Sequence, residues 1–446
     1  MNRRAFLGAS LAAGAAAQPS PKRPNVIFLF ADDMGYGDLQ CYGHPTIRTP
    51  NLDRMAEEGL RFTSYYAAAP FCTPSRVGLL TGRYPIRAGL PNNLGPDSVN
   101  GLPLTEITLA QHLQSAGYRT KAIGKWHLGH NPEAYLPTSR GFDSYFGILY
   151  SNDMEPPYVK TETPLKLYRD KAPVEYPVNQ STLTERYTGE AVRFIRDNRS
   201  QPFFLYLPYA MPHLPVSASS RLGKSRAGLY GDVIETIDWS AGEILKTLRE
   251  LGLDSHTMVA FMSDNGPWLN LPARMLAKEN QPWHTGFKSL LRGAKGNTYE
   301  GGQRVPGIVR WPGMIPARQV NADIASTLDM FPTVCAAASL PLPKDRVYDG
   351  VNLLPTLQGK APSPRDHFFY FRSNILEAYR EGSWKVRHAR FDSPLKPGEP
   401  IVPELFNLDD DPAEQYNRYE RNRALGDKML ARLRAFAAER GARLDA

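Results

Sequence analysis

The chain has 446 residues, of which 42% are hydrophobic and 22% are charged, a composition typical of a globular protein with a sizeable core. This length suits a large α/β domain together with a smaller one. The formal net charge of +8 mildly favours anionic ligands. The sequence has no run of lysines and arginines and no basic patch interleaved with aromatics, so nothing in it indicates nucleic-acid binding.

Residues 1–17 are typical of an export signal. The pair Arg3-Arg4 resembles the start of a twin-arginine leader, and the small-residue run after it ends in three alanines at 15–17. This stretch is too short and too rich in Gly and Ala to anchor the protein in a bilayer, and no cysteine follows it for lipidation. We therefore expect a periplasmic or secreted protein without a membrane anchor. The alternative is a disordered N-terminus in a cytoplasmic protein.

The first elements are a strand and a helix. Asn25 is followed by five apolar residues, which predicts a buried strand at 25–30 that leads directly into Asp32 and Asp33. A helix with one apolar face is expected to begin at Pro50 and to end at Gly59. Strand followed by helix is the first unit of an α/β pattern.

Three further strands are predicted along the chain, each followed by polar residues. They lie at 120–123, 203–207 and 258–262, with helical segments between them. This alternation is typical of a mostly parallel sheet covered by helices on both faces. The polar residues that follow the three strands are Lys125 and His127, then His213, then Asp264 and Asn265. Since ligands bind beyond the carboxyl ends of strands in such sheets, we expect these side chains to converge.

The acidic residues at two of these strand ends indicate a metal site. Asp32, Asp33 and Asp264 offer carboxylates and Asn265 offers an amide oxygen. Such donors suit a hard cation, and Ca²⁺ tolerates an irregular oxygen shell better than Mg²⁺ does. Without a cation, three converging carboxylates would repel one another. The alternative for Asp32 and Asp33 is a polar turn after a strand.

The string from Cys72 to Gly82, CTPSRVGLLTG, resembles the maturation signature of the sulfatase family, whose cysteine is oxidised to a formylglycine aldehyde. The alternative is a small buried cysteine before a helix that begins with proline. A thiolate that attacked a sulfate ester would form an adduct with no easy route back to free enzyme. A hydrated aldehyde carries two hydroxyls, one to attack sulfur and one to expel sulfate. The resemblance implies a formylglycine-generating maturation enzyme as a partner.

Other segments also resemble sulfatases, in family order. They are 25–39, 124–129, 263–266 and 295–302, and the segment 150–153 resembles arylsulfatase A-like and N-acetylgalactosamine-6-sulfatase-like members. The resemblance covers nearly the whole chain after the leader. It implies an alkaline-phosphatase-like α/β fold, with a mixed, mostly parallel sheet flanked by helices. It also implies one Ca²⁺ beside the formylglycine.

Carried over position by position, the resemblance assigns the site residues. The metal site would comprise Asp32, Asp33, Cys72, Asp264 and Asn265. Arg76 would hold the aldehyde hydrate, and Lys125, His127, Ser151, His213 and Lys295 would surround the sulfate. For Ser151, a turn-forming role is the alternative.

The chemistry of S–O cleavage agrees with this assignment. Negative charge develops on the non-bridging oxygens, where Ca²⁺, Lys125 and Lys295 are suited as preorganised positive groups. His213 or Lys295 would protonate the leaving alkoxide. His127 would take the proton from the second hydroxyl, so that sulfate is released and the aldehyde restored.

The pattern predicts three regions: the leader at 1–17, a catalytic α/β domain at 24–345 and a small C-terminal subdomain at 346–446. In the last region, four short antiparallel strands are expected near 367–371, 378–380, 384–386 and 404–408. A final helix would pack the apolar face that includes Met429, Leu430 and Leu433 against them. The segment from Pro156 to Pro177 is expected to be a long loop, either at the substrate entrance or as a surface excursion.

Two cysteines and several aromatic residues are left open. Cys41 and Cys335 could form a disulfide, but two separate buried thiols are the favoured interpretation. Trp268, Trp283 and the loop 150–154 would either stack a sugar ring or belong to the core. A sulfated glycan or an aryl sulfate is the expected substrate.

The sequence is compatible with two other functions. A phosphodiesterase or phosphonate hydrolase of the same superfamily is the runner-up, because the site would also suit a phosphoryl centre. A non-catalytic binding protein with the same fold would show a broken site, and no break is visible in the sequence.

Overall fold

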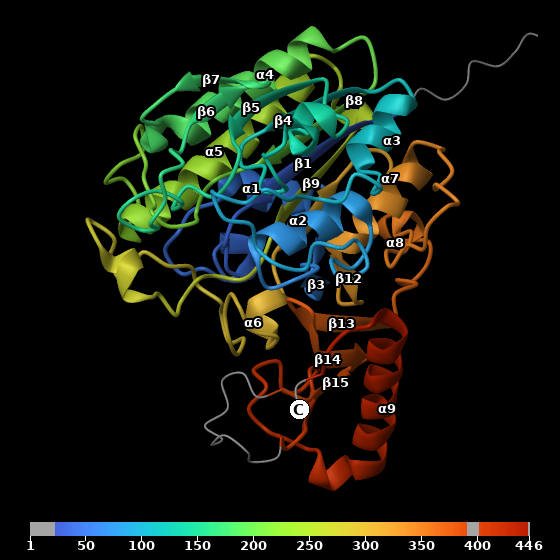
Figure 1. The fold of residues 1–446 in the computed structure, drawn as a ribbon. Helices are drawn as coiled ribbons and strands as arrows, with labels where there is room; N and C mark the ends of the chain where they lie inside the picture. Colours follow the sequence, from blue (N-terminus) through green and yellow to red (C-terminus); the bar gives the residue numbers. More distant parts are fainter. Residues whose placement is uncertain (1–22, 390–400, 445–446) are drawn as a thin grey trace, which may run out of the picture.

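The computed structural model describes residues 23–389 and 401–444 (Figure 1). The expected export signal at 1–17 lies outside the described residues. A ten-stranded sheet forms the centre of the molecule. In sheet order its strands are β11 (Gln319–Asn321), β2 (Leu60–Phe62), β10 (Gly307–Arg310), β9 (Thr257–Ser263), β1 (Asn25–Ala31), β8 (Phe203–Pro208), β4 (Arg119–Ile123), β5 (Ser144–Ile148), β6 (Leu167–Arg169) and β7 (Ala172–Glu175).

The sheet is mixed, and its central part is parallel. β9, β1, β8, β4 and β5 run parallel to one another, whereas β10, β6 and β7 are antiparallel to their neighbours. The four strands predicted from apolar runs are β1, β4, β8 and β9, and they lie side by side. Every residue of β1, β8 and β9 is buried, which explains why these strands read as continuous apolar runs.

Helices cover the sheet (Figure 1). α1 (Pro50–Glu57), α4 (Leu183–Asp197) and α5 (Gly228–Glu250) pack as one group, in which α5 contacts the other two. α2 (Cys72–Thr81) contacts α3 (Leu109–Ser115) and α7 (Met330–Ala337), and α7 also contacts α8 (Leu354–Leu357). The expected helix after Pro50 is confirmed: it runs to Glu57, Glu58 is its C-cap, and the expected closing Gly59 follows. A Cβ atom on Gly59 would lie 2.3 Å from the carbonyl oxygen of Val309, so glycine there permits the close approach of β10.

The segment 156–177 is not the single long loop that was expected. It contains β6 and β7, which extend the central sheet beyond β5. Strands of three and four residues are too short to show a periodic pattern, and a proline such as Pro173 in β7 is unfavourable inside a central strand. As an edge strand, β7 tolerates the proline.

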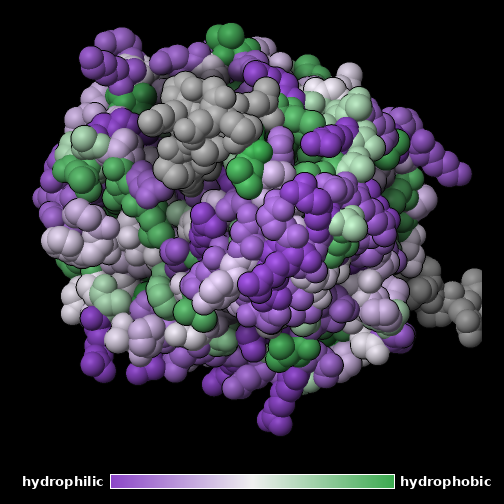
Figure 2. Space-filling view, turned by 90° about the horizontal axis from the view of Figure 1, so that it is seen from below, coloured by the Kyte–Doolittle hydropathy of each residue, from purple (hydrophilic) through white to green (hydrophobic). Residues whose placement is uncertain are grey.

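A second, four-stranded antiparallel sheet lies below the first (Figure 1). Its strands are β13 (His367–Arg372), β14 (Ile375–Glu381), β15 (Trp384–Arg387) and β16 (Glu404–Asn407), and α9 (Arg423–Arg440) packs on β14 and β15. Met429, Leu430 and Leu433 are buried in this contact, as predicted. Figure 2 views the molecule from below, the side on which this sheet lies, and there hydrophobic residues are scattered among hydrophilic ones.

Smaller elements join the two sheets. β3 (Tyr65–Tyr66) and β12 (Ala325–Ser326) form a two-stranded sheet, and α6 (Glu300–Gln303) lies between the large sheet and β13 (Figure 1). Cys41 and Cys335 are free thiols, the former half-buried and the latter buried, so the disulfide alternative is wrong. Among the described residues, no helix is long and apolar enough to cross a bilayer.

Candidate active site

The acidic residues lie where β1 and β9 end. These strands pair in register from Asn25 with Thr257 to Ala31 with Ser263, so Asp32 and Asp264 follow at neighbouring positions. The N–H of Asp33 donates to Oδ1 of Asp264 at 3.0 Å. Asp33 has a φ of 65°, in the left-handed region, which Asp tolerates better than most residues. The strand pairing and this turn together bring the acidic residues into contact, as the sequence predicted.

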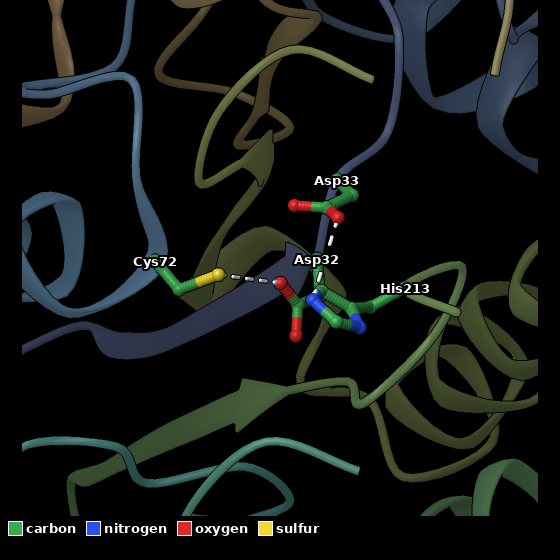
Figure 3. Close-up of side chains that lie close together, drawn as sticks. All are labelled: Asp32, Asp33, Cys72 and His213. Atoms are coloured by element: carbon green, nitrogen blue, oxygen red, sulfur yellow. Dashed lines mark hydrogen bonds and ion pairs between the residues drawn. The ribbon is translucent and has the colours of Figure 1, made fainter. Parts of the chain in front are cut away.

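Cys72 is the first residue of α2, and its side chain points toward this acidic group (Figure 3). Its Sγ lies 3.4 Å from Oδ1 of Asp32 and 3.3 Å from Nζ of Lys295. Potential ligand atoms of Asp32, Asp33, Cys72 and His213 all lie within 4.8 Å of one another. All residues of α2 are buried, and the helix ends at Thr81, followed by Gly82 with a φ of 66°.

Three cationic side chains surround the carboxylates. Nζ of Lys125 donates to Oδ2 of Asp32 at 2.5 Å, and Nζ of Lys295 lies 2.7 Å from Oδ1 of Asp33. The Arg76 guanidinium donates to Oδ2 of Asp264 at 2.8 Å and to the carbonyl oxygen of Lys125 at 2.7 Å. The side chains of Arg76 and Lys125 are fully buried, and that of Lys295 is 8% exposed. Such charges are stable in the interior only because each is paired.

The two histidines are held by backbone carbonyls. Nε2 of His127 lies 2.8 Å from the carbonyl oxygen of Leu94, whereas its buried Nδ1 has no hydrogen-bond partner. Because a carbonyl only accepts, Nε2 carries the hydrogen and Nδ1 keeps a lone pair. Burial and the charge of Lys125 lower the pKa of His127 well below its ordinary value. Nδ1 of His213 bonds to the carbonyl of Leu214 at 2.6 Å, and its Nε2 lies 3.5 Å from Asp33.

Ser151 belongs to the same group of side chains. Its Oγ accepts a hydrogen bond from Nζ of Lys125 at 3.0 Å, and the residue is 1% exposed. Trp268 lies beside the site, with its ring 5.4 Å from the ring of His213 and 4.8 Å from Nζ of Lys295. Trp283, in contrast, is 71% exposed, so the core interpretation of that residue is wrong.

The carboxylates differ in their affinity for protons. Burial raises the pKa of Asp32, but the charges of Lys125 and His213 outweigh it and hold that pKa well below its ordinary range. Burial and the neighbouring charge of Asp32 raise the pKa of Asp264 to about 7. Burial, together with Asp32, also raises the pKa of the Cys72 thiol. A nearby divalent cation would favour the charged form of every one of these groups.

The residues present fit a hard cation. Oδ1 of Asn265 is buried and has no hydrogen-bond partner, whereas its Nδ2 donates to Oδ1 of Asp33 at 2.7 Å. An orphaned carbonyl oxygen beside three carboxylates is a ligand set that Ca²⁺ accepts. Cys72 and His213 add the donor types that Zn²⁺ prefers, but the carboxylate and amide oxygens outnumber them. The arrangement therefore suits a divalent cation held mainly by oxygen atoms.

Two contacts that support His127 were not predicted from the sequence. The carbonyl of Leu94 orients His127, but any residue has a backbone carbonyl. Thr73 donates from Oγ1 to the carbonyl oxygen of His127 at 3.0 Å, and its N–H donates to Asn93. Thr73 follows Cys72 directly in the sulfatase-like motif, and this position is the one sequence feature that could have indicated its role in the site.

Known proteins resemble this chain over most of its length. Residues 24–340 match the family model of the sulfatases, and residues 294–438 match that of the C-terminal part of N-sulphoglucosamine sulphohydrolase. N-acetylgalactosamine-6-sulfatase of Rattus norvegicus is 42% identical over 395 residues, which are 84% of this chain and 73% of that protein. Arylsulfatase A of Bos taurus is 40% identical over 450 residues, which cover 92% of this chain and 85% of that protein.

Solved structures agree with these relatives. A protein of glycosaminoglycan metabolism from Bacteroides thetaiotaomicron has a TM-score of 0.80 and 29% identity, and covers 94% of this chain and 100% of its own. A sulfatase from Pseudoalteromonas sp. has a TM-score of 0.81 and 30% identity, with coverages of 94% and 90%. At 20% identity and a TM-score of 0.65, the phosphonate monoester hydrolase of Agrobacterium radiobacter shares the fold, covering 94% of this chain and 96% of its own. The chain thus belongs to the sulfatase family and is a sulfuric ester hydrolase with an alkaline-phosphatase-like fold.

Proposed function

We propose that this enzyme hydrolyses sulfate esters through a formylglycine made from Cys72, with Ca²⁺ held by Asp32, Asp33, Asp264 and Asn265. The observation that supports it is the convergence of Lys125 and Lys295 on the carboxylates beside Cys72. The hydrogen bond of Lys125 to Ser151 and the ion pair of Arg76 with Asp264 further support the proposal.

The chain's own residues would bind and orient the sulfate. Lys125 and Lys295 would donate to its non-bridging oxygens, since both ammonium groups lie at the site and are held by carboxylates. Ser151 would keep Lys125 in place through its Oγ. Arg76 would neutralise Asp264, which its guanidinium meets at 2.8 Å, and would hold the aldehyde hydrate. A bound Ca²⁺ would supply a fixed positive charge beside the sulfate oxygens.

Proton transfers would fall to the histidines and Lys295. A hydrated formylglycine at position 72 would supply two hydroxyls. One would pass its proton to a carboxylate of the site and bond to sulfur as the bond to the leaving alcohol breaks, and deprotonation of the other would expel sulfate. His213 or Lys295 would give a proton to the leaving oxygen. His127 would take the proton of the second hydroxyl at Nδ1, the ring nitrogen that has no other partner. Water then rehydrates the aldehyde.

The substrate we propose is a sulfated glycan, with an aryl sulfate as a surrogate. The support comes from the names of the relatives, which include an N-acetylgalactosamine-6-sulfatase and an arylsulfatase A. We further propose export through the leader at 1–17 and maturation by a formylglycine-generating enzyme. An exported enzyme would meet extracellular glycans.

The mass of the proteolytic peptide that contains Cys72 tests this proposal, in protein isolated from its native host. An aldehyde mass is expected, and an unmodified thiol would contradict the mechanism. The same digest gives the mature N-terminus, which is expected after Ala17; a chain that retains residues 1–17 would contradict processing of the leader.

Substitution Cys72→Ala is expected to reduce sulfate release from an aryl sulfate by at least about 10³-fold, because the nucleophile is lost. The melting temperature of this variant serves as the control for folding. Unchanged hydrolysis by folded Cys72→Ala would show that the nucleophile is another group. Paired aryl sulfate and aryl phosphonate esters test the phosphoryl alternative, since faster cleavage of the phosphonate would favour it over a sulfatase.

A further inference from the structure

The segment that carries Lys295 lies between the two sheets. We call residues 294–300 the Lys295 segment; it leads into α6, which Figure 1 shows between the large sheet and β13. Its first half is fixed to the loops of the active site. The N–H of Lys295 donates to the carbonyl of Pro267 at 3.0 Å, and that of Gly296 donates to the carbonyl of Pro70 at 3.0 Å. Pro267 comes two residues after Asn265, and Pro70 two residues before Cys72.

The second half of the Lys295 segment is held by a lysine of the other sheet. Lys385 lies on β15, and its side chain is fully buried. Its Nζ donates to the carbonyl oxygen of Thr298 at 2.8 Å and to Oε1 of Glu300 at 3.0 Å, and lies 2.8 Å from Oε1 of Glu414. Both of these hydrogen bonds go to the Lys295 segment, whereas the contact with Glu414 is an ion pair, since Oε1 of Glu414 accepts no hydrogen bond.

Other residues of the C-terminal region bond to the same stretch. Oγ1 of Thr298 donates to Oε2 of Glu377 on β14 at 2.7 Å. The hydroxyl of Tyr299 donates to Oε2 of Glu404 on β16 at 2.8 Å, and the N–H of Glu300 donates to Oε2 of Glu414 at 2.7 Å. Three successive residues are therefore tied to the four-stranded sheet or to the chain that follows it, just after the segment leaves the active site.

This contact is charged, although it is buried. Burial raises the pKa of Glu300, but Lys385, Arg304 and Arg380 outweigh it and lower that pKa to about 2. Burial, opposed by Lys385, raises the pKa of Glu414 to about 7. Buried ion pairs are weak evidence for stability, because well-packed apolar residues often stabilise a core as well or better. Hydrogen bonds have a preferred direction, so they can fix the backbone position of a short segment, which apolar packing does not do.

We propose that Lys385 is a positioning residue for Lys295: the second sheet sets the place of the sulfate-binding lysine through Thr298 and Glu300. This inference rests on the proposed role of Lys295. Thr298 lies three residues from Lys295, within about 10 Å along the chain. The ammonium group of Lys295 must meet both Asp33 and the sulfate, and a displacement of about 1 Å costs on the order of 10²-fold in rate. Glu377 supports the same stretch from the neighbouring strand.

The variant Lys385→Met tests the proposal, with Lys121→Met as the matched control. Both substitutions remove a lysine ammonium group that pairs with a glutamate. Lys121 pairs with Glu190 at 2.9 Å, and both residues are far from Lys295 in the sequence. For Lys385→Met we expect KM for an aryl sulfate to rise and kcat to fall, with kcat/KM about 10- to 100-fold lower. A purely structural loss would reduce the amount of active enzyme and leave KM unchanged, as we expect for Lys121→Met.

If Lys385→Met does not fold, Thr298→Val tests whether the second sheet positions the Lys295 segment. This substitution removes the hydrogen bond from Thr298 to Glu377 on β14 at nearly constant side-chain volume. A severalfold rise in KM for folded Thr298→Val is expected. An unchanged KM in whichever of the two variants folds would overturn the proposal.

A double-mutant cycle separates this inference from the proposed function. If Lys385 acts through Lys295, then Lys385→Met adds little to the defect of Lys295→Ala, whereas effects that multiply would overturn the positioning role. A normal Lys295→Ala enzyme would refute the role of Lys295 itself, and the inference would fall with it. A defective Lys295→Ala enzyme beside a normal Lys385→Met enzyme would refute the positioning role alone.

Discussion

At the scale of single residues, the active site balances three carboxylates against three cations. Asp32 and Asp33 pair with the two lysines, and Asp264 pairs with Arg76. With this balance, the charge of a bound Ca²⁺ would leave the site net positive. An anionic sulfate ester would then be attracted without requiring an excess of basic side chains. The modest net charge of the whole chain is therefore compatible with an anion-binding enzyme.

The variant His127→Gln tests the proposed base. The amide nitrogen of glutamine lies near the position of Nε2 and can still donate to the carbonyl of Leu94, but the side chain has no nitrogen lone pair in place of Nδ1. We expect kcat to fall by about 10²- to 10⁴-fold while KM for an aryl sulfate changes little. Steady-state kinetics measures both values. A large rise in KM with unchanged kcat would assign His127 to substrate binding and not to proton transfer.

At the scale of elements, a charged contact joins α4 to the edge of the large sheet. Glu190 on α4 accepts hydrogen bonds from Lys121 on β4 at 2.9 Å and from Arg169 on β6 at 2.9 Å. Burial raises the pKa of Glu190, but Arg169 and Lys121 outweigh it and lower that pKa to about 2. The carboxylate side chain is only 7% exposed, so its bonds are partly shielded from water.

Glu190→Gln is expected to lower the free energy of unfolding by about 1–3 kcal/mol at pH 7. Because the folded pKa is depressed, this stabilisation is fully present above the ordinary glutamate pKa of 4.5 and disappears as the pH falls through about 2. Urea unfolding of both proteins at several pH values measures the difference. A difference that stays constant down to pH 2 would contradict the linkage.

At the scale of the whole molecule, the proposed metal site would connect separate parts of the fold. Asp32 follows β1, Asp264 follows β9 and Cys72 begins α2, so a cation there would link the sheet to a helix that packs on it. A ligand that binds only the folded state stabilises it by about 2.7 kcal/mol at 100 times its Kd.

Chelation of divalent cations is therefore expected to lower the melting temperature and to abolish sulfate release. Added Ca²⁺ should restore both, and Mg²⁺ should restore them less well, because it demands a regular octahedral shell. Calorimetry and an aryl sulfate assay give the two readouts. Recovery with Zn²⁺ alone would contradict the assignment of Ca²⁺.

Much of the site was predictable because its residues follow strands. Apolar runs located β1 and β9, and a parallel sheet places the residues after such strands at one edge. Asp32 and Asp264 could therefore be brought together from the sequence. The contact of Trp268 with Lys295 could not, because it depends on loop shape. The short strands β6 and β7 were missed because three or four residues carry too little periodicity. The proposed boundary between residues 345 and 346 stays a prediction.

The amino-acid sequence by itself determined the family, the central strands and the residue types of the site. Those features are local: an apolar run, a motif around Cys72, an acidic pair after a strand. Only the tertiary structure decided which ring nitrogen of His127 is free, how Lys125 and Lys295 share the carboxylates, and that Lys385 reaches the Lys295 segment. The physical reason is that hydrogen bonds and ion pairs act over about 3 Å, and such distances between remote residues are set by packing of the whole chain.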